Sequence, residues 1–136
     1  MTKKSLLKYL QSKKLCVLST CNLKNKPEAA VMCIVTGNDF CFYLFTGKNT
    51  RKFHNIDDNK KVALVVGGLN NDPSVQIVAL AQILNSDESK VASSLIVKTC
   101  PEWQDYFSKT TKFLKITPNL AHYSDFSKNI FKEFLF

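Results

Sequence analysis

Short apolar segments, joined by polar turns of a few residues, fill the first half of the chain and leave few folds open. Three of these segments, at residues 15–20, 29–36 and 40–46, are rich in β-branched or aromatic residues and are predicted to be strands. The turns between them, at 22–27 and 37–39, are too short for a parallel crossover, which needs about a dozen residues or more. The three strands are therefore expected to form an antiparallel meander.

The rest of the sequence adds strands and a few short helices to this meander. Further strands are predicted at 61–66, 75–84, 112–117 and 120–123, with Pro118 and Asn119 separating the last two. Helices are predicted at 2–13, from about 49 to 56, at 86–97 and at about 127–136, with Thr2, Asn49 and Ser86 capping the first three. Six or seven strands with short connections favour a mainly β fold, an antiparallel barrel with peripheral helices. We expect one domain spanning residues 1–136.

One strand differs from the others in its pattern. The segment 29–36 is almost continuously apolar, whereas a half-buried strand alternates apolar and polar residues. We therefore expect this strand to be covered on both faces.

Composition narrows the classes of function. The formal net charge is +8, but the lysines are scattered and no nucleic-acid-binding module is recognisable, so they are interpreted as solvated surface charge. No apolar run approaches the roughly 18 residues of a membrane span, and the N-terminus lacks the apolar core of a signal peptide. A cytoplasmic location is expected.

Five cysteines without a Cys-x-x-Cys motif, and two separated histidines, predict free buried thiols and no metal site.

The segment from Phe45 to Lys52 is the best candidate for a binding site. It contains Arg51, the single arginine beside 18 lysines, at the expected start of a short helix. Free N–H groups at a helix start attract anions, and a guanidinium suits phosphate or carboxylate. Thr46 and Thr50 could add hydroxyl donors. The segment is not a P-loop, because Phe42 stands where that motif needs a glycine. From these eight residues alone, an ordinary lysine-rich surface helix is the favoured interpretation.

Longer stretches of the chain keep the order and spacing of one known family. These stretches are Lys26–Met32, Val35-Thr36, Phe45-Thr46, Thr50–Ile56, Lys61–Gly67, Ser74–Gln76, Thr117–Asn119 and Tyr123–Phe126. In them the chain resembles the pyridoxamine 5′-phosphate oxidase-like family of FMN-binding split barrels, over roughly residues 12–126. The resemblance implies a six-stranded antiparallel Greek-key split barrel that forms a homodimer with FMN at the interface.

The resemblance also implies roles for individual residues. Arg51 and Lys52 match the basic pair that holds the FMN phosphate, and Thr50 stands in place of the usual small hydroxyl residue. The remaining implied contacts fall on three strands. They are Phe45 and Thr46 at a strand end beside the phosphate, Ala30, Val31, Met32 and Cys33 along the isoalloxazine ring, and Gln76, which approaches the flavin from the other subunit.

Two positions depart from the vitamin B6 oxidase. Ala30 and Val35 stand where that enzyme has basic residues that help to bind the cofactor. Oxidation of pyridoxamine phosphate is therefore not the activity that we expect. The leading hypothesis is an FMN-dependent oxidoreductase acting on an unknown small molecule. The alternatives are a non-enzymatic flavin carrier or sensor, and a split barrel that binds another cofactor such as haem. No side chain is marked as an acid or base, and His54 and Trp103 are interpreted as structural.

Overall fold

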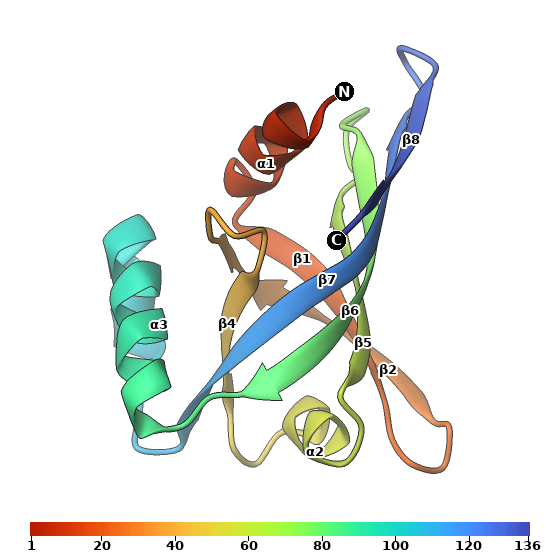
Figure 1. Cartoon of the computed structure of the whole chain (residues 1–136). Coiled ribbons are helices and arrows are strands. Elements are labelled where there is room, and N and C mark those ends of the chain that lie inside the picture. The colour runs from red at the N-terminus through yellow and green to blue at the C-terminus, as the bar shows by residue number, and fades with distance from the viewer.

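An antiparallel sheet curls into a half-barrel in the computed structural model, which describes residues 1–136 (Figure 1). Its strands are β1 (Leu15–Cys21), β2 (Pro27–Cys33), β3 (Val35–Thr36), β4 (Phe42–Gly47), β5 (Lys61–Gly67), β6 (Ser74–Ile83), β7 (Thr111–Asp125) and β8 (Ile130–Leu135). The order across the sheet is β2-β1-β5-β6-β7-β4-β3, and β8 pairs with β7 outside this path. The predicted mainly β, antiparallel fold is confirmed, with eight strands in place of six.

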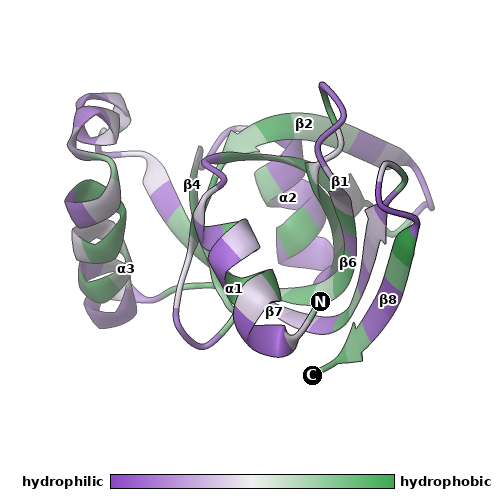
Figure 2. Cartoon of the chain, turned by 90° about the horizontal axis from the view of Figure 1, so that it is seen from above, coloured by the Kyte–Doolittle hydropathy of each residue, from purple (hydrophilic) through white to green (hydrophobic).

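The helices close the ends and one side of this sheet. They are α1 (Lys3–Gln11), α2 (Arg51–Asp58), α3 (Ser86–Thr99) and the 3₁₀ helix η1 (Pro101–Tyr106). Figure 2 looks down the half-barrel, with α1 near the upper opening and α2 visible through the ring of strands at the far end. Helix α3 lies outside the barrel, alongside β4 (Figure 1). No helix is long and apolar enough to cross a membrane.

Alternating strand residues build the core. In β6, the residues from Val75 to Ala81 alternate between buried and exposed, as expected for a strand with one covered face. The inward residues of the sheet join Leu6 and Leu10 of α1 in one main cluster. A second, smaller cluster lies between α3, η1 and β3, and it contains Trp103. Helices α3 and η1 therefore cover the β3–β4 side of the sheet, and the outward residues of β1, β2, β5 and β6 stay exposed.

The C-terminal segment is a strand, so the helix predicted at about 127–136 is wrong. Its apolar residues are spaced as in an amphipathic helix, but β7 offers a long unpaired edge. Strand β8 pairs with that edge from Leu120 to Asp125, and this pairing satisfies the backbone groups along one edge of β8. Phe134 is buried in the main cluster as a result.

The predicted break at Pro118 and Asn119 is a bulge in one continuous strand, β7. Pro118 pairs with Ala79 and Leu120 pairs with Val78, so Asn119 is an extra residue in the ladder. Proline has no N–H to donate, and a bulge is one of the places where a sheet tolerates it. The carbonyl of Asn119 accepts a hydrogen bond from the N–H of Phe136 at 3.1 Å.

The apolar segment 29–36 is not covered on both faces within one chain. It divides at Ile34 into β2 and β3, and the N–H of Ile34 donates to the carbonyl of Lys14 at 2.9 Å. Val35 turns into the smaller cluster beside Trp103. In β2, the side chain of Val31 is 69% exposed. The outward side of β2 is therefore apolar and exposed at Val31.

The five cysteines are free, as predicted. Cys16, Cys41 and Cys100 are buried, whereas Cys21 and Cys33 are half-buried. Burial raises the pKa of the Cys16 thiol to about 12, so this thiol is protonated at neutral pH.

Candidate cofactor-binding site

Thr50 holds the start of α2 in place. Its hydroxyl donates to the carbonyl of Gly47 at 2.9 Å and accepts from the N–H of Phe53 at 3.3 Å. The hydroxyl of Thr46 lies 3.2 Å away. Thr50 is therefore the N-cap of α2, and the predicted cap, Asn49, lies one residue too early. At α3 the cap is likewise displaced, because Asn85 takes the place expected for Ser86.

Helix α2 is anchored to the sheet through its inner side. The side-chain amide of Asn55 donates to the hydroxyl of Thr20 in β1 at 3.0 Å, and both residues are buried. Ile56, on the same side, is fully buried. This anchoring leaves the first turn free, so that Arg51 and Lys52 face away from the core. The N–H groups of that first turn have no preceding helical carbonyls to bond.

A cavity of about 350 Å³ lies beneath the start of α2. Its lining joins the helix start to the inner side of β1 and β2, and consists of Leu18, Thr20, Glu28, Ala29, Ala30, Thr50, Arg51 and Lys52. Both positive charges and the start of α2 therefore line one partly open cavity, which suits an anionic group.

A second cavity, of about 300 Å³, adjoins the first and shares Thr50 and Lys52 with it. Its other lining residues come from β2, β4 and the segment after η1, and are Val31, Met32, Cys33, Phe45, Thr46, Gly47, Tyr106, Ser108 and Thr111. Strand β2 ends the strand order of the sheet, so one of its edges has unpaired backbone groups that can bond a ligand.

The structure thus brings together every predicted site residue except Gln76. Gln76 is exposed on the outer face of β6, where it pairs with Val65 of β5 and His122 of β7. Within one chain it is not part of either cavity.

Aromatic packing supports the wall of the second cavity. The Phe45 ring lies 5.0 Å from the Phe107 ring and 6.2 Å from the Trp103 ring, centroid to centroid. Trp103 is buried in the smaller core cluster and does not line either cavity, as expected of a structural aromatic residue. His54 is exposed and is not among the residues that line the two cavities.

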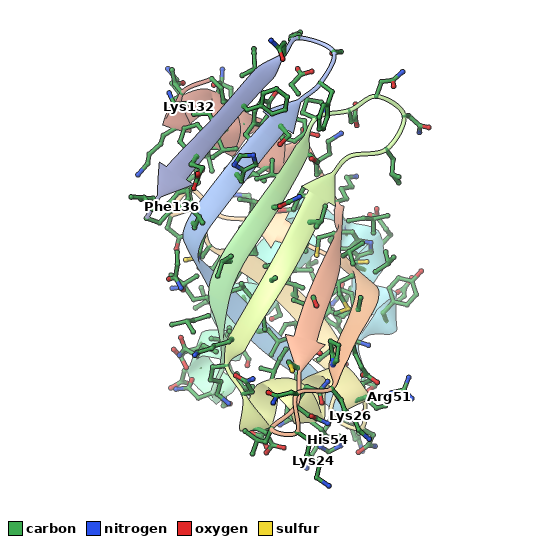
Figure 3. All side chains as sticks on the ribbon, turned by 90° about the vertical axis from the view of Figure 1, so that its right-hand side faces the viewer. Lys24, Lys26, Arg51, His54, Lys132 and Phe136 are labelled. Carbon is green, nitrogen blue, oxygen red and sulfur yellow. The ribbon has the colours of Figure 1, made fainter.

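Arg51 forms an ion pair with Glu28 that the sequence analysis did not predict. Its Nε lies 2.8 Å from Oε1 of Glu28, and the exposed fractions of the two side chains are 87% and 33%. Figure 3 shows Arg51 projecting from the α2 end of the molecule, near Lys26 of the β1–β2 turn. Glu28 belongs to the segment that carries the family resemblance, but its charge opposite Arg51 becomes visible only once β2 and α2 are placed together.

Four other lining residues with polar side chains were also missed. Thr20 pairs with Glu28 across β1 and β2, and Tyr106, Ser108 and Thr111 close the far side of the second cavity. No local motif marks these residues. Thr20 reaches the site through the pairing of β1 with β2, and the other three through the packing of η1 and β7 against β4.

Comparison with known proteins identifies the family. The sequence profile described as pyridoxamine 5′-phosphate oxidase matches residues 2–125. This chain belongs to the pyridoxamine 5′-phosphate oxidase family. Within it, the chain is 34% identical over 73 residues to a pyridoxine/pyridoxamine 5′-phosphate oxidase of Anaplasma marginale (strain St. Maries). That match covers 54% of this chain, but only 34% of the length of the curated relative.

Several solved structures have the same fold as this chain. General Stress Protein 26 from Bacillus anthracis str. Sterne has a TM-score of 0.74 at 21% identity, and the match covers 98% of this chain and all of that one (100%). A heme binding protein from Mycobacterium smegmatis has a TM-score of 0.78 at 9% identity, over 95% of this chain and 56% of that one. These likenesses confirm the split-barrel architecture.

Proposed function

We propose that this protein binds FMN, with the phosphate at the start of α2 and the isoalloxazine ring along β2. The observation that carries the proposal is the pair of adjoining cavities that share Thr50 and Lys52. One has the positive charges and the free amides, and the other has the apolar and aromatic wall. FMN has the same division between a dianionic phosphate and a planar ring.

The phosphate end suits the first cavity. Arg51 offers up to five N–H donors in a rigid fork, and Lys52 adds a point charge. The start of α2 lines the same space and adds the positive end of the helix dipole. Thr50 uses its hydroxyl on Gly47 and Phe53, so its role is to position this turn. Arg51 and Lys52 would therefore carry most of the binding to the phosphate.

The ring end suits the second cavity. Val31, Met32 and Cys33 present the free edge of β2, whose N–H and C=O groups can bond the polar edge of a flavin. Phe45, held by Phe107, gives an apolar surface on the opposite side. When bound, FMN supplies the capacity for hydride or electron transfer. The residues of this chain bind and orient it.

We further propose that a second copy of the chain covers the outer face of the sheet. Val17, Val31 and Val65 lie side by side on that face across β2, β1 and β5, and Val31 and Val65 are 69% and 39% exposed. Apolar surface of this kind is favourable to bury. Gln76 lies next to Val65 on the same face, so in a homodimer it could reach the flavin of the partner subunit.

An FMN-dependent oxidoreductase of a small molecule is the activity that these features support. Haem is the second candidate, because the Mycobacterium smegmatis neighbour is named as a heme binding protein. Neither cavity contains a histidine, but Met32, Cys33 and Tyr106 of the second cavity are residue types that also bind haem iron. The identity of the released cofactor therefore decides between FMN and haem.

The test is cofactor identification followed by titration. We expect the purified protein, or the apoprotein reloaded with FMN, to show a flavin spectrum, and the released cofactor to have the mass of FMN. A haem spectrum would favour the second candidate. Well-folded protein that cannot be loaded with FMN at high concentration would overturn the proposal. Reduced nicotinamide that bleaches the flavin, followed by turnover with an acceptor, separates an oxidoreductase from a carrier or sensor.

A further inference from the structure

Glu28 faces the same guanidinium that the proposed phosphate would use. Its Oε1 lies 2.8 Å from Nε of Arg51, at the mouth of the first cavity, and it is the only acidic side chain in the lining of either cavity. A carboxylate and a phosphate both satisfy arginine through the same type of charge-assisted bond. The protein therefore carries an internal anion where the external anion is expected.

The geometry of this pair makes it easy to displace. The Arg51 side chain is 87% exposed, so the pair is screened by water. No other charged group is paired with Glu28. When a phosphate dianion enters the cavity, Arg51 would lose one exposed ion pair with Glu28 and gain contacts to several phosphate oxygens.

Glu28 cannot move far from the site after it is displaced. It is held in β2, paired with Thr20 of β1, and its side chain is only 33% exposed. Its charge therefore stays beside the bound phosphate and opposes it. With Glu28 ionised, Arg51, Lys52 and Glu28 together carry one net positive charge.

We propose that Glu28 is a specificity-determining residue that occupies Arg51 in the free protein and weakens binding of the phosphate. This inference rests on the proposed FMN site. Glu28 should act only on ligands that carry the phosphate. Riboflavin has the same ring as FMN without the phosphate, so Glu28 should lower the affinity for FMN and leave that for riboflavin unchanged.

The test compares Glu28→Gln with the wild type by titrating FMN and riboflavin into full-length protein. Glutamine keeps the size and the position of the side chain and removes its charge. We expect the dissociation constant for FMN to fall by up to about fivefold and that for riboflavin to stay unchanged. Inorganic phosphate alone, titrated into the apoprotein, should also bind the variant more tightly than the wild type.

Two further variants sharpen the result. Glu133→Gln makes the same chemical change in β8, at the opposite end of the molecule from α2 (Figure 1), and should leave both dissociation constants unchanged. In an Arg51→Ala background, the gain from Glu28→Gln should shrink, because the guanidinium that Glu28 occupies is gone. Thermal unfolding of each variant checks that the fold is retained.

The outcomes separate this inference from the proposed function. If no variant binds FMN, both are overturned. If FMN binds through Arg51 but Glu28→Gln binds it no more tightly, or more weakly, the inference alone fails, and weaker binding would identify Glu28 as a residue that positions Arg51. An equal gain for FMN and riboflavin would also overturn the inference, because the effect would not depend on the phosphate.

Discussion

Replacing Arg51 with alanine tests the phosphate assignment with little risk to the fold. The side chain is 87% exposed, and its ion pair with Glu28 is the polar contact that the replacement removes. Exposed ion pairs contribute from about zero to about 1 kcal/mol to stability. We therefore expect the free energy of unfolding of Arg51→Ala to lie within about 1 kcal/mol of the wild-type value.

The same replacement should weaken FMN binding far more than it weakens the fold. A hydrogen bond to a charged group contributes roughly 1.5–3 kcal/mol, which corresponds to about 10- to 150-fold in the dissociation constant. Ala30 and Val35 supply no charge to the site, so Arg51 has few partners to compensate for its loss. Arg51→Lys keeps the charge but loses the rigid fork, and its dissociation constant should lie between those of the wild type and Arg51→Ala.

Flavin fluorescence during titration of the apoprotein measures the affinity, and urea unfolding measures the stability. Lys48→Ala is the matched control, because Lys48 is an exposed cation in the turn just before α2 and is not part of the lining of either cavity. We expect it to change FMN binding by less than Arg51→Ala does. An Arg51→Ala protein that binds FMN as tightly as the wild type would refute the phosphate assignment. Equal losses in Lys48→Ala and Arg51→Ala would show that general charge, not a bound phosphate, is responsible.

Three other outcomes can be measured without the cofactor. Thr50→Val removes the N-cap of α2 and should lower the free energy of unfolding by about 1 kcal/mol, whereas Thr50→Ser keeps the hydroxyl and should keep the wild-type value. Equal urea midpoints for Thr50→Val and the wild type would contradict the capping role. Val78→Lys places a charge on the exposed outer face of β6 and should convert the proposed dimer to a monomer, as measured by light scattering. Val91→Lys on α3 is the control and should leave the dimer intact. A wild-type protein that is monomeric would exclude the dimer. Burial raises the pKa of the Cys16 thiol and of the Tyr43 phenol, each to about 12, from ordinary values of 9.0 and 10.0. Because these groups ionise at lower pH in the unfolded chain, their contribution to the free energy of unfolding should be complete below about pH 9 and should be lost as the pH rises toward 12. A urea midpoint that is equal at pH 8 and pH 10.5 would contradict this.

Local patterns were sufficient for most of the strands and for the position of the basic pair. The turns at 22–27 and 37–39 were too short for anything but antiparallel neighbours, and the observed pairing of β1 with β2 and of β3 with β4 agrees. The helix start at Arg51 was also visible, because it follows an aromatic strand and a polar turn. Short turns and helix starts are determined by residues that lie within a few positions of one another in the sequence.

Long-range pairing explains the elements that were wrong. The spacing of apolar residues at 130–135 fits a helix in isolation, but the free edge of β7 makes the segment a strand. Pro118 normally ends a strand, yet a bulge opposite Val78 and Ala79 lets β7 continue. In both places a partner distant in the sequence supplied hydrogen bonds that outweighed the local preference.

The amino-acid order alone was enough to indicate an antiparallel barrel and an anion site around Arg51, because turn length, strand composition and helix capping are local properties. Folding in three dimensions settled what surrounds that arginine. It placed the Glu28 carboxylate 2.8 Å from the guanidinium, joined two cavities through Thr50 and Lys52, and left Val31 exposed on the outer face. Charge interactions and burial depend on distances in space, and residues far apart in the chain acquire those distances only when the sheet curls.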